Sequence, residues 1–213
     1  KRGAFGMGGM SAQVIAKANP KEINEKALAG VKKDKERELK QGNDGAWVAH
    51  PSLVVPVKNI FEKNFDGPNQ MKKFNNDKIN RRDLLDEPKI EKAITESGVR
   101  ENLQEGIEYM AYWLFGTGAS VVNYLMADVA TCEVSRAQLW VWLKYKVKLD
   151  DERTVNEDLI DKLIADELDK TKKRVGDEIY KKVPFEKAAK IFKNMITKEN
   201  FDDFLTLPLY EKI

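Results

Sequence analysis

Two short apolar segments, residues 5–10 and 45–51, lie on either side of one long amphipathic stretch. Neither segment alternates polar and apolar residues, so each predicts a strand covered on both faces, as in a parallel sheet flanked by helices. Two strands leave open edges, and open edges need further strands. The sequence therefore predicts the end of a larger β/α sheet and a chain that is a piece of a longer protein. Lys1 in place of an initiating methionine supports this expectation.

Apolar residues at helical spacing predict a surface helix between the two strands. Asn19 is expected to cap this helix, Pro20 to occupy its first position, and Gly42 to end it in the left-handed conformation. A further helix is expected to open at Pro56. This order of elements predicts two consecutive β/α units.

In the second part of the chain, the sequence predicts helices and no strands. Apolar periodicity predicts helices over residues 99–115, 121–146, 158–175 and 185–196. A polar, basic stretch between residues 67 and 88 separates them from the β/α part, so we place one domain at residues 1–76 and a helical domain at residues 77–213. Trp113, Trp140 and Trp142 lie in apolar helical stretches and are expected in the core.

Charge and residue counts exclude several classes of function. The 213 residues include 37 Lys and Arg against 35 Asp and Glu, and a net charge of +2 is too weak to hold nucleic acid or an anionic membrane. Cys132 and His50 are the sole residues of their types, which excludes an internal disulfide, a multi-cysteine zinc site and a histidine-rich metal cluster. No stretch reaches the roughly twenty apolar residues of a membrane span.

Generic catalytic patterns are mostly missing. The glycines of residues 3–9 lack a phosphate-binding pattern, and we favour a tight strand end, where the backbone packs or approaches a ligand closely, over a phosphate site. His50, at the end of a strand, either points into a ligand crevice or is a satisfied, partly buried histidine.

Asp128 is the most unusual acidic residue. It stands among Leu125, Met126, Val129 and Ala130, and burial among such side chains would raise its pKa and make it a proton acceptor near neutral pH. Alternatively, it caps a helix or pairs with Arg136. Residue spacing leaves these alternatives open.

Several separated motifs occur in the order found in the A-type malate synthase family, which this chain resembles along almost its whole length. The motifs are Gly8-Gly9-Met10-Ser11-Ala12-Gln13, Asn24-Glu25-Lys26-Ala27-Leu28, Asp44-Gly45-Ala46-Trp47-Val48-Ala49-His50-Pro51, Leu125-Met126-Ala127-Asp128-Val129-Ala130-Thr131, Glu133-Val134-Ser135-Arg136 and Asp203-Phe204-Leu205-Thr206-Leu207-Pro208. Two residues depart from the family pattern: Ala127 replaces a usual glutamate, and Ser52 replaces a usual glycine.

The resemblance implies the last β/α units of a TIM-type (β/α)8 barrel followed by a helical carboxyl-terminal domain. It implies condensation of acetyl-CoA with glyoxylate and water to give malate and CoA in the glyoxylate cycle. Asp128 matches the family's catalytic acid/base, which takes a proton from the acetyl methyl group. Pro51 and Met126 match positions on the acetyl-CoA side of the site.

The resemblance also implies Mg²⁺, whose ligands, with an arginine, belong to upstream barrel strands, so this chain alone is expected to be inactive. Two alternatives stay open: a related magnesium-dependent CoA-thioester lyase and a non-enzymatic helical interaction module. The last residues, Glu211-Lys212-Ile213, do not form a peroxisomal address, which favours the cytoplasm over a glyoxysome or peroxisome. The sequence does not indicate an oligomeric state.

Overall fold

The computed structural model describes residues 3–73, 76, 78–85 and 93–212. The chain divides into two compact units, of which the first contains residues 1–88 with Asn123–Met126, and the second contains Lys89–Val122 with Ala127–Ile213. Residue 77, where we expect the helical domain to begin, lies outside the described residues.

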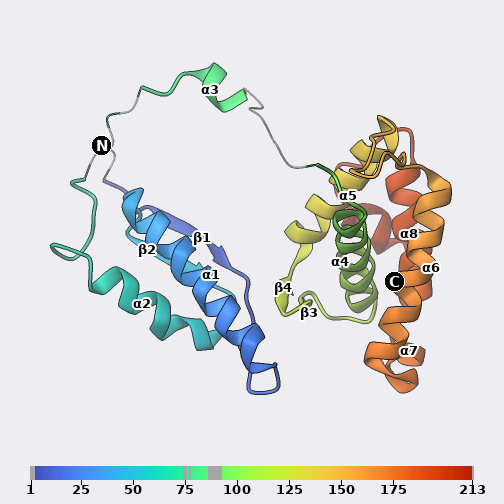
Figure 1. Ribbon diagram of the computed structural model, residues 1–213, viewed down its shortest axis with the longest axis horizontal. Helices are drawn as coiled ribbons and strands as arrows, with labels where there is room; N and C mark the ends of the chain where they lie inside the picture. The colour runs from blue at the N-terminus through green and yellow to red at the C-terminus, as the bar shows by residue number, and fades with distance from the viewer. Residues whose placement is uncertain (1–2, 74–75, 77, 86–92, 213) are drawn as a thin grey trace. The chain divides into compact units, whose positions relative to one another are not determined.

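The first unit is built on a parallel pair of strands, β1 (Met7–Ser11) and β2 (Gly45–Val48), connected by helix α1 (Lys21–Lys40) (Figure 1). This confirms the predicted strand–helix–strand unit. Met10 pairs with Trp47 and Ser11 with Val48, while the register shifts between Met7 and Met10. The shift is the mark of a bulge, which bends a strand locally.

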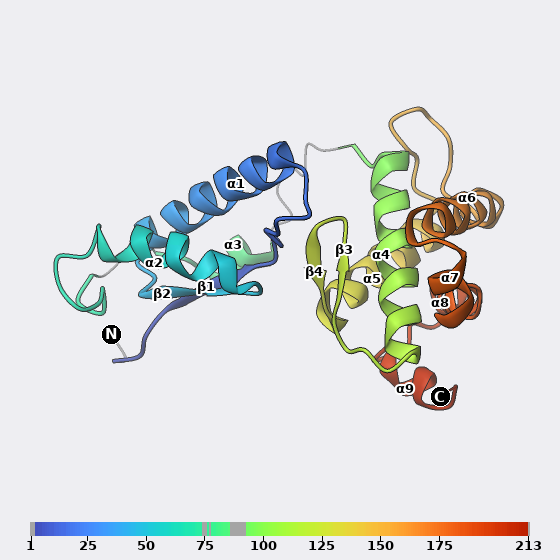
Figure 2. The ribbon, with the colours of Figure 1, turned by 90° about the horizontal axis from the view of Figure 1, so that it is seen from below.

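Helices α1 and α2 (Val54–Glu62) pack together on one face of this sheet, and a short 3-10 turn (Pro51–Leu53) leads into α2 (Figure 2). Their buried apolar side chains are Val31, Leu39, Leu53, Val57 and Phe61. Met7 and Trp47 are 62% and 60% exposed on the sheet. The sheet therefore has a second apolar surface, as expected of parallel strands that are covered on both faces. Helix α3 (Arg81–Leu85) follows later in this part of the chain.

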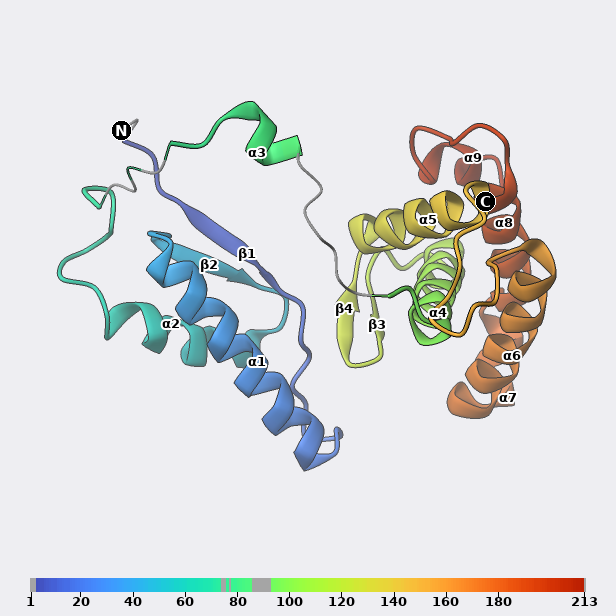
Figure 3. The same cartoon turned by 45° about the horizontal axis from the view of Figure 1, so that its top comes forward.

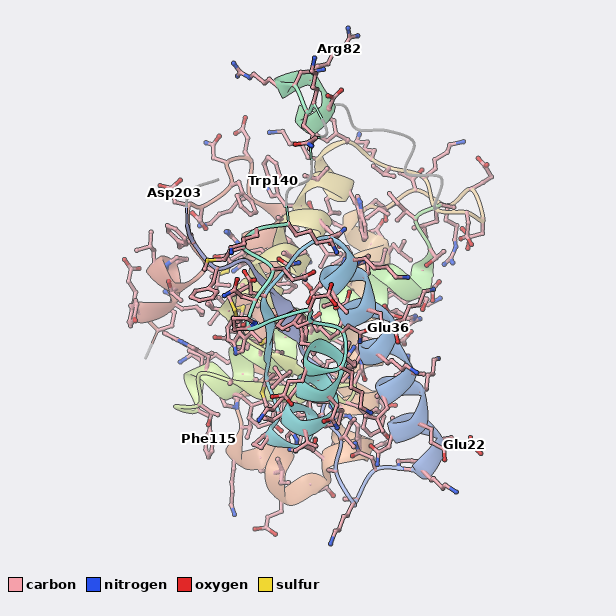
Figure 4. All side chains as sticks on the ribbon, turned by 90° about the vertical axis from the view of Figure 1, so that its left-hand side faces the viewer. Glu22, Glu36, Arg82, Phe115, Trp140 and Asp203 are labelled. Atoms are coloured by element: carbon pink, nitrogen blue, oxygen red, sulfur yellow. The ribbon has the colours of Figure 1, made fainter. Side chains whose placement is uncertain are left out.

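The start of α1 differs from the prediction. The Asn19 side chain does not cap the helix but donates to the Val14 carbonyl at 2.7 Å and to Asn24 Oδ1 at 3.1 Å, and Pro20 occupies the cap position. Gly42 has a φ of 94°, as predicted. Helix α2 begins at Val54, before Pro56, because the 3-10 turn already directs the chain into it. Glu22 and Glu36, two of the polar side chains of α1, are labelled in Figure 4.

The buried ion pair of Lys35 and Glu38 connects α1 to β1 through hydrogen bonds to the backbone of Gly9. Lys35 Nζ donates to both Glu38 carboxylate oxygens at 2.9 Å and to the Gly9 carbonyl at 2.6 Å, and the Gly9 N–H donates to Glu38 Oε1 at 3.0 Å. A Cβ atom at Gly8 would lie 1.9 Å from Glu38 Oε2. The glycines thus permit the close approach of a side chain to the backbone, which confirms that expectation.

The second unit is a helical domain around α4 (Glu96–Leu114), which packs against α5 (Val129–Lys144), α6 (Glu157–Val175) and α8 (Phe185–Thr197) (Figure 3). Three of the predicted helices are confirmed here within a few residues. Two short helices, α7 (Asp177–Lys182) and α9 (Thr206–Tyr210), were not predicted. Side chains from α4, α5, α6 and α8 form one apolar core.

The predicted helix over residues 121–146 is wrong at its start. A hairpin of β3 (Ser120–Val122) and β4 (Leu125–Ala127) precedes α5. Asn123 and Tyr124 both have positive φ angles, 49° and 64°, which is the requirement of a two-residue hairpin turn. The turn was missed because Tyr124 stands where such turns usually have glycine.

The three tryptophans are only partly buried. Trp113 and Trp142 pack against the core of the second unit, which agrees with their predicted place. Trp140 instead packs against Phe201 with the two rings tilted by 56° and their centroids 5.2 Å apart, and it donates from its indole nitrogen to the Lys198 carbonyl at 2.8 Å. Trp140 therefore contacts the chain segment that follows α8 rather than the core.

Candidate functional site

Asp128 is the N-cap residue of α5. Its extended backbone follows the end of β4 at Ala127, and its Oδ1 accepts the Thr131 N–H at 3.1 Å. The Thr131 hydroxyl accepts the Asp128 N–H at 2.9 Å, which completes a reciprocal capping box. The capping alternative is therefore correct, and the carboxylate is held at the positive end of a helix dipole.

The other two expectations about the surroundings of Asp128 are corrected. Leu125 and Val129 are 42% and 40% exposed, so the apolar neighbours in sequence do not enclose the half-buried carboxyl group. Turn and helix-start geometry directs these side chains outward. Arg136 pairs with Glu133 rather than with Asp128, because residues three apart on a helix lie on the same face.

Two ionisable groups on α4, Glu105 and Tyr109, lie in the electrostatic surroundings of Asp128. Burial raises the pKa of Glu105 on α4. The hydrogen bond that Ser135 Oγ donates to Glu105 Oε2 at 3.4 Å lowers this pKa in part, and the charge of Asp128 raises it further. Burial raises the pKa of Tyr109 to about 12, and its hydroxyl donates to the Gly118 carbonyl at 3.2 Å. Burial also raises the pKa of the Cys132 thiol well above its usual range, so this thiol is not a nucleophile.

Met126 lies in the part of the hairpin that belongs to the first unit. The Met126 N–H donates to the Ala12 carbonyl at 2.7 Å, and the Val14 N–H donates to the Tyr124 carbonyl at 2.8 Å. This segment thus pairs with the chain directly after the carboxyl end of β1, where ligand sites of parallel α/β folds gather. Only Ala127 separates Met126 from Asp128.

Pro51 begins the 3-10 turn after β2 in the first unit. His50 before it is half-buried, with Nδ1 2.7 Å from Ser52 Oγ, and the Ser52 hydroxyl contacts the Ile15 carbonyl at 3.2 Å. His50 is therefore a satisfied histidine, which was one of the two alternatives. Ser52 supplies the hydrogen bonds that a glycine at this position would lack.

In the described part of the chain, no three or more His, Cys, Asp or Glu side chains come together in a way that could hold a metal ion. None of the described helices combines the length and apolar character of a membrane span.

Two family models together match most of the chain. The description "Malate synthase, TIM barrel domain" applies to residues 1–87, and "Malate synthase, C-terminal" applies to residues 93–213. The chain belongs to the malate synthase family. The division between the two matched regions follows the same order as the two structural units.

Individual malate synthases resemble the chain over its full length. The glyoxysomal malate synthases of Cucumis sativus and Glycine max are 40% and 41% identical to it, and the malate synthase of Myxococcus xanthus is 38% identical. All of the chain is covered, but only 38% of each plant enzyme and 39% of the bacterial enzyme. The chain thus spans about two fifths of the length of these malate synthases.

Sequence reasoning found Asp128 but missed the groups around it. Glu105 and Tyr109 lie on α4 and carry no motif, since only the packing of α4 on α5 brings them to the start of α5. Thr131 could have been found, because a cap residue followed three positions later by a hydroxyl side chain resembles a capping box.

Proposed function

We propose that this chain is the carboxyl-terminal part of a malate synthase and that Asp128 is its catalytic base. The observation that supports the proposal is the capping box that fixes the Asp128 carboxylate at the start of α5, in a chain that belongs to the malate synthase family. The reaction is the condensation of acetyl-CoA with glyoxylate and water to malate and CoA. The name shared by the relatives supports this reaction.

The capping box suits a base whose carboxylate must stay fixed. Both bonds from Thr131 end on Oδ1, at 3.1 Å from the N–H and 3.0 Å from the hydroxyl, so we assign proton transfer to Oδ2. Oδ2 accepts a proton from the acetyl methyl carbon, and the C–H electron pair forms an enolate. The enolate carbon then attacks the glyoxylate aldehyde carbon, and the C=O electron pair moves onto the aldehyde oxygen, which takes up a proton to become the malyl hydroxyl. Water then cleaves the malyl-CoA thioester, which leaves malate and the CoA thiol. A positioned general base contributes typically 10²- to 10⁴-fold to such a step.

A separate proposal concerns the first unit. We assign residues 1–76 to the last β/α units of a TIM-type barrel and residues 77–213 to the helical domain. Pro51 and Met126 would contact acetyl-CoA, since Pro51 follows the carboxyl end of β2 and Met126 pairs with the chain after β1.

Among the described residues, no group of three or more His, Cys, Asp or Glu side chains could hold Mg²⁺, so we assign no residue of this chain to that ion. When bound elsewhere in the enzyme, Mg²⁺ would polarise the glyoxylate oxygen. The cytoplasmic location stays a prediction. The alternative is a glyoxysome, which is the location given in the names of the plant relatives.

Asp128→Asn tests the assignment in a protein of full malate synthase length that carries these residues. Asparagine caps helices as well as aspartate, so the fold is retained while the base is lost. We expect malate formation to fall by about 10²-fold or more, with acetyl-CoA binding unchanged. Asp158→Asn, in the first turn of α6, is the matched control and should keep full turnover. Near-normal turnover of the Asp128 variant would refute the assignment.

A CoA-thioester lyase is separated from this function by assaying malyl-CoA cleavage against condensation on the same protein. The match of residues 93–213 to the malate synthase C-terminal domain favours condensation. An interaction module without enzymatic activity would leave both assays negative.

A further inference from the structure

A buried ion pair between Glu133 and Arg136 lies in the second turn of α5 after the Asp128 cap. Glu133 Oε2 accepts from Arg136 Nε at 2.8 Å and lies 2.7 Å from Arg136 Nη2. The Arg136 side chain is fully buried, and that of Glu133 is 23% exposed. Both residues belong to the motif that follows Asp128, and the proposed chemistry gives neither of them a role.

This ion pair holds the segment after α8, residues 198–205, which we call the C-terminal strap. Glu133 Oε1 accepts the Leu205 N–H at 2.6 Å, and Arg136 Nη2 donates to the Asp202 carbonyl at 2.9 Å. The Arg136 guanidinium lies 3.8 Å from the centroid of the Phe201 ring. The strap is thus bound through its backbone and one aromatic ring, contacts that fix direction as well as distance.

Trp140, labelled in Figure 4, lies farther along α5 and also contacts the strap. Its indole nitrogen donates to the Lys198 carbonyl at 2.8 Å. The spacing of Glu133, Arg136 and Trp140 places them along one side of the helix. On another side, Cys132 Sγ lies 3.7 Å from the Gly106 carbonyl and Ser135 contacts Glu105. Helix α5 is therefore held between the strap and α4.

Stability alone is a weak account of this arrangement. Buried ion pairs lose about as much in desolvation as they gain in attraction, and apolar side chains of similar volume are often as stabilising. Arg136 Nη1 is buried without a hydrogen-bond partner among the described residues, which is a further cost. What the pair supplies is orientation, since each Glu133 oxygen and each bonded guanidinium nitrogen has a specified direction.

We propose that Glu133 and Arg136 are positioning residues that use the C-terminal strap to fix the start of α5, and with it the carboxylate of Asp128, for proton abstraction. This inference rests on the proposed function. A helix is stiff over its first turns, so a shift at Glu133 is transmitted to Asp128, and a displacement of about 1 Å can cost about 10²-fold in rate.

The test replaces Arg136 by Lys and, separately, Glu133 by Gln in a protein of full malate synthase length. We expect kcat to fall about 10- to 100-fold while the KM for glyoxylate stays within about twofold. We also expect a larger isotope effect on kcat with methyl-deuterated acetyl-CoA, because proton abstraction becomes slower. Simple loss of folded protein would lower kcat and leave the isotope effect unchanged.

Arg100→Lys is the matched control, because Arg100 on α4 also has several acidic partners, namely Glu96, Asp166 and Glu167. It should lower stability and leave kcat and the isotope effect unaltered. If Arg136→Lys does not fold, Phe201→Leu removes the ring under the guanidinium and keeps both charges.

Wild-type kcat in the Arg136, Glu133 and Phe201 variants, or a fall in kcat without a change in the isotope effect, would overturn the positioning role. The Asp128→Asn result keeps the two proposals apart. Turnover by Asp128→Asn refutes the base assignment, whereas an inactive Asp128→Asn beside a fully active Arg136→Lys refutes the positioning role alone.

Discussion

Thr131 and Asp128 bind each other in both directions at the start of α5. The Thr131 N–H donates to Asp128 Oδ1 at 3.1 Å, and the Asp128 N–H donates to Thr131 Oγ1 at 2.9 Å. Asp128 therefore lies between the hairpin and α5, and its carboxylate both caps the helix and is the candidate base. Because the two bonds depend on different atoms, substitutions can separate the structural role of Asp128 from its proposed chemical role.

Thr131→Ala should destabilise the second unit by about 1 kcal/mol, since it removes the hydroxyl that accepts the Asp128 N–H and leaves α5 with half of its capping box. Urea unfolding followed by far-UV circular dichroism measures the change. Thr131→Ser is the control and should lie within a few tenths of a kcal/mol of wild type, because the hydroxyl remains. Equal stability of all three proteins would show that the return bond contributes nothing.

Two glycine-to-alanine changes in the first unit should have opposite signs. Gly8→Ala places a Cβ atom 1.9 Å from Glu38 Oε2 and should destabilise the unit by about 1–3 kcal/mol, because the buried Lys35–Glu38 pair must shift. Gly30→Ala, on the exposed side of α1 with no atom within 4 Å, should stabilise it by about 0.5–1 kcal/mol. Urea unfolding of both variants measures these changes, and a destabilised Gly30 variant would contradict the helical argument.

The regular elements of this chain could be predicted because their patterns are local. The spacing of Val31 and Leu39 predicted α1, and the continuous apolar run around Trp47 predicted β2. The β3–β4 hairpin could not be predicted, because a helix-like apolar pattern continues through residues 121–127 and the turn at Asn123 and Tyr124 lacks glycine.

The candidate site was predicted in part for the same reason. The motif around Asp128 indicated the residue, and its capping role was among the alternatives, because a cap is a local arrangement. Glu105 and the strap residue Phe201 contact or influence α5 from far along the sequence. Their places depend on helix packing, which short-range periodicity does not encode.

The thiol of Cys132 should resist modification in the folded protein. It is fully buried, and burial raises its pKa well above the usual range, so very little thiolate is present and reagent access is closed. With a disulfide reagent at pH 8, we expect labelling to follow global unfolding and to reach one thiol per chain only in denaturant. Rapid labelling under native conditions would show that α5 opens locally away from α4.

Glu105 should make the stability of the second unit depend on pH. Its pKa is raised in the folded state, chiefly by burial, so folding favours the protonated form. The stability that Glu105 contributes is therefore fully present below the ordinary pKa of 4.5 and is lost as the pH rises through the raised value.

Glu105→Gln removes this loss, because the amide stays neutral. We expect the variant to be more stable than wild type at pH 7 and to approach it as the pH falls toward about 4. Urea unfolding at a series of pH values measures the difference. Glu178→Gln, on α7 with a side chain 83% exposed, should show only a small, pH-independent change and is the control. Parallel curves for wild type and Glu105→Gln would mean that the carboxyl group is solvated in the folded protein, in which case it adds no charge-dependent constraint beside Asp128.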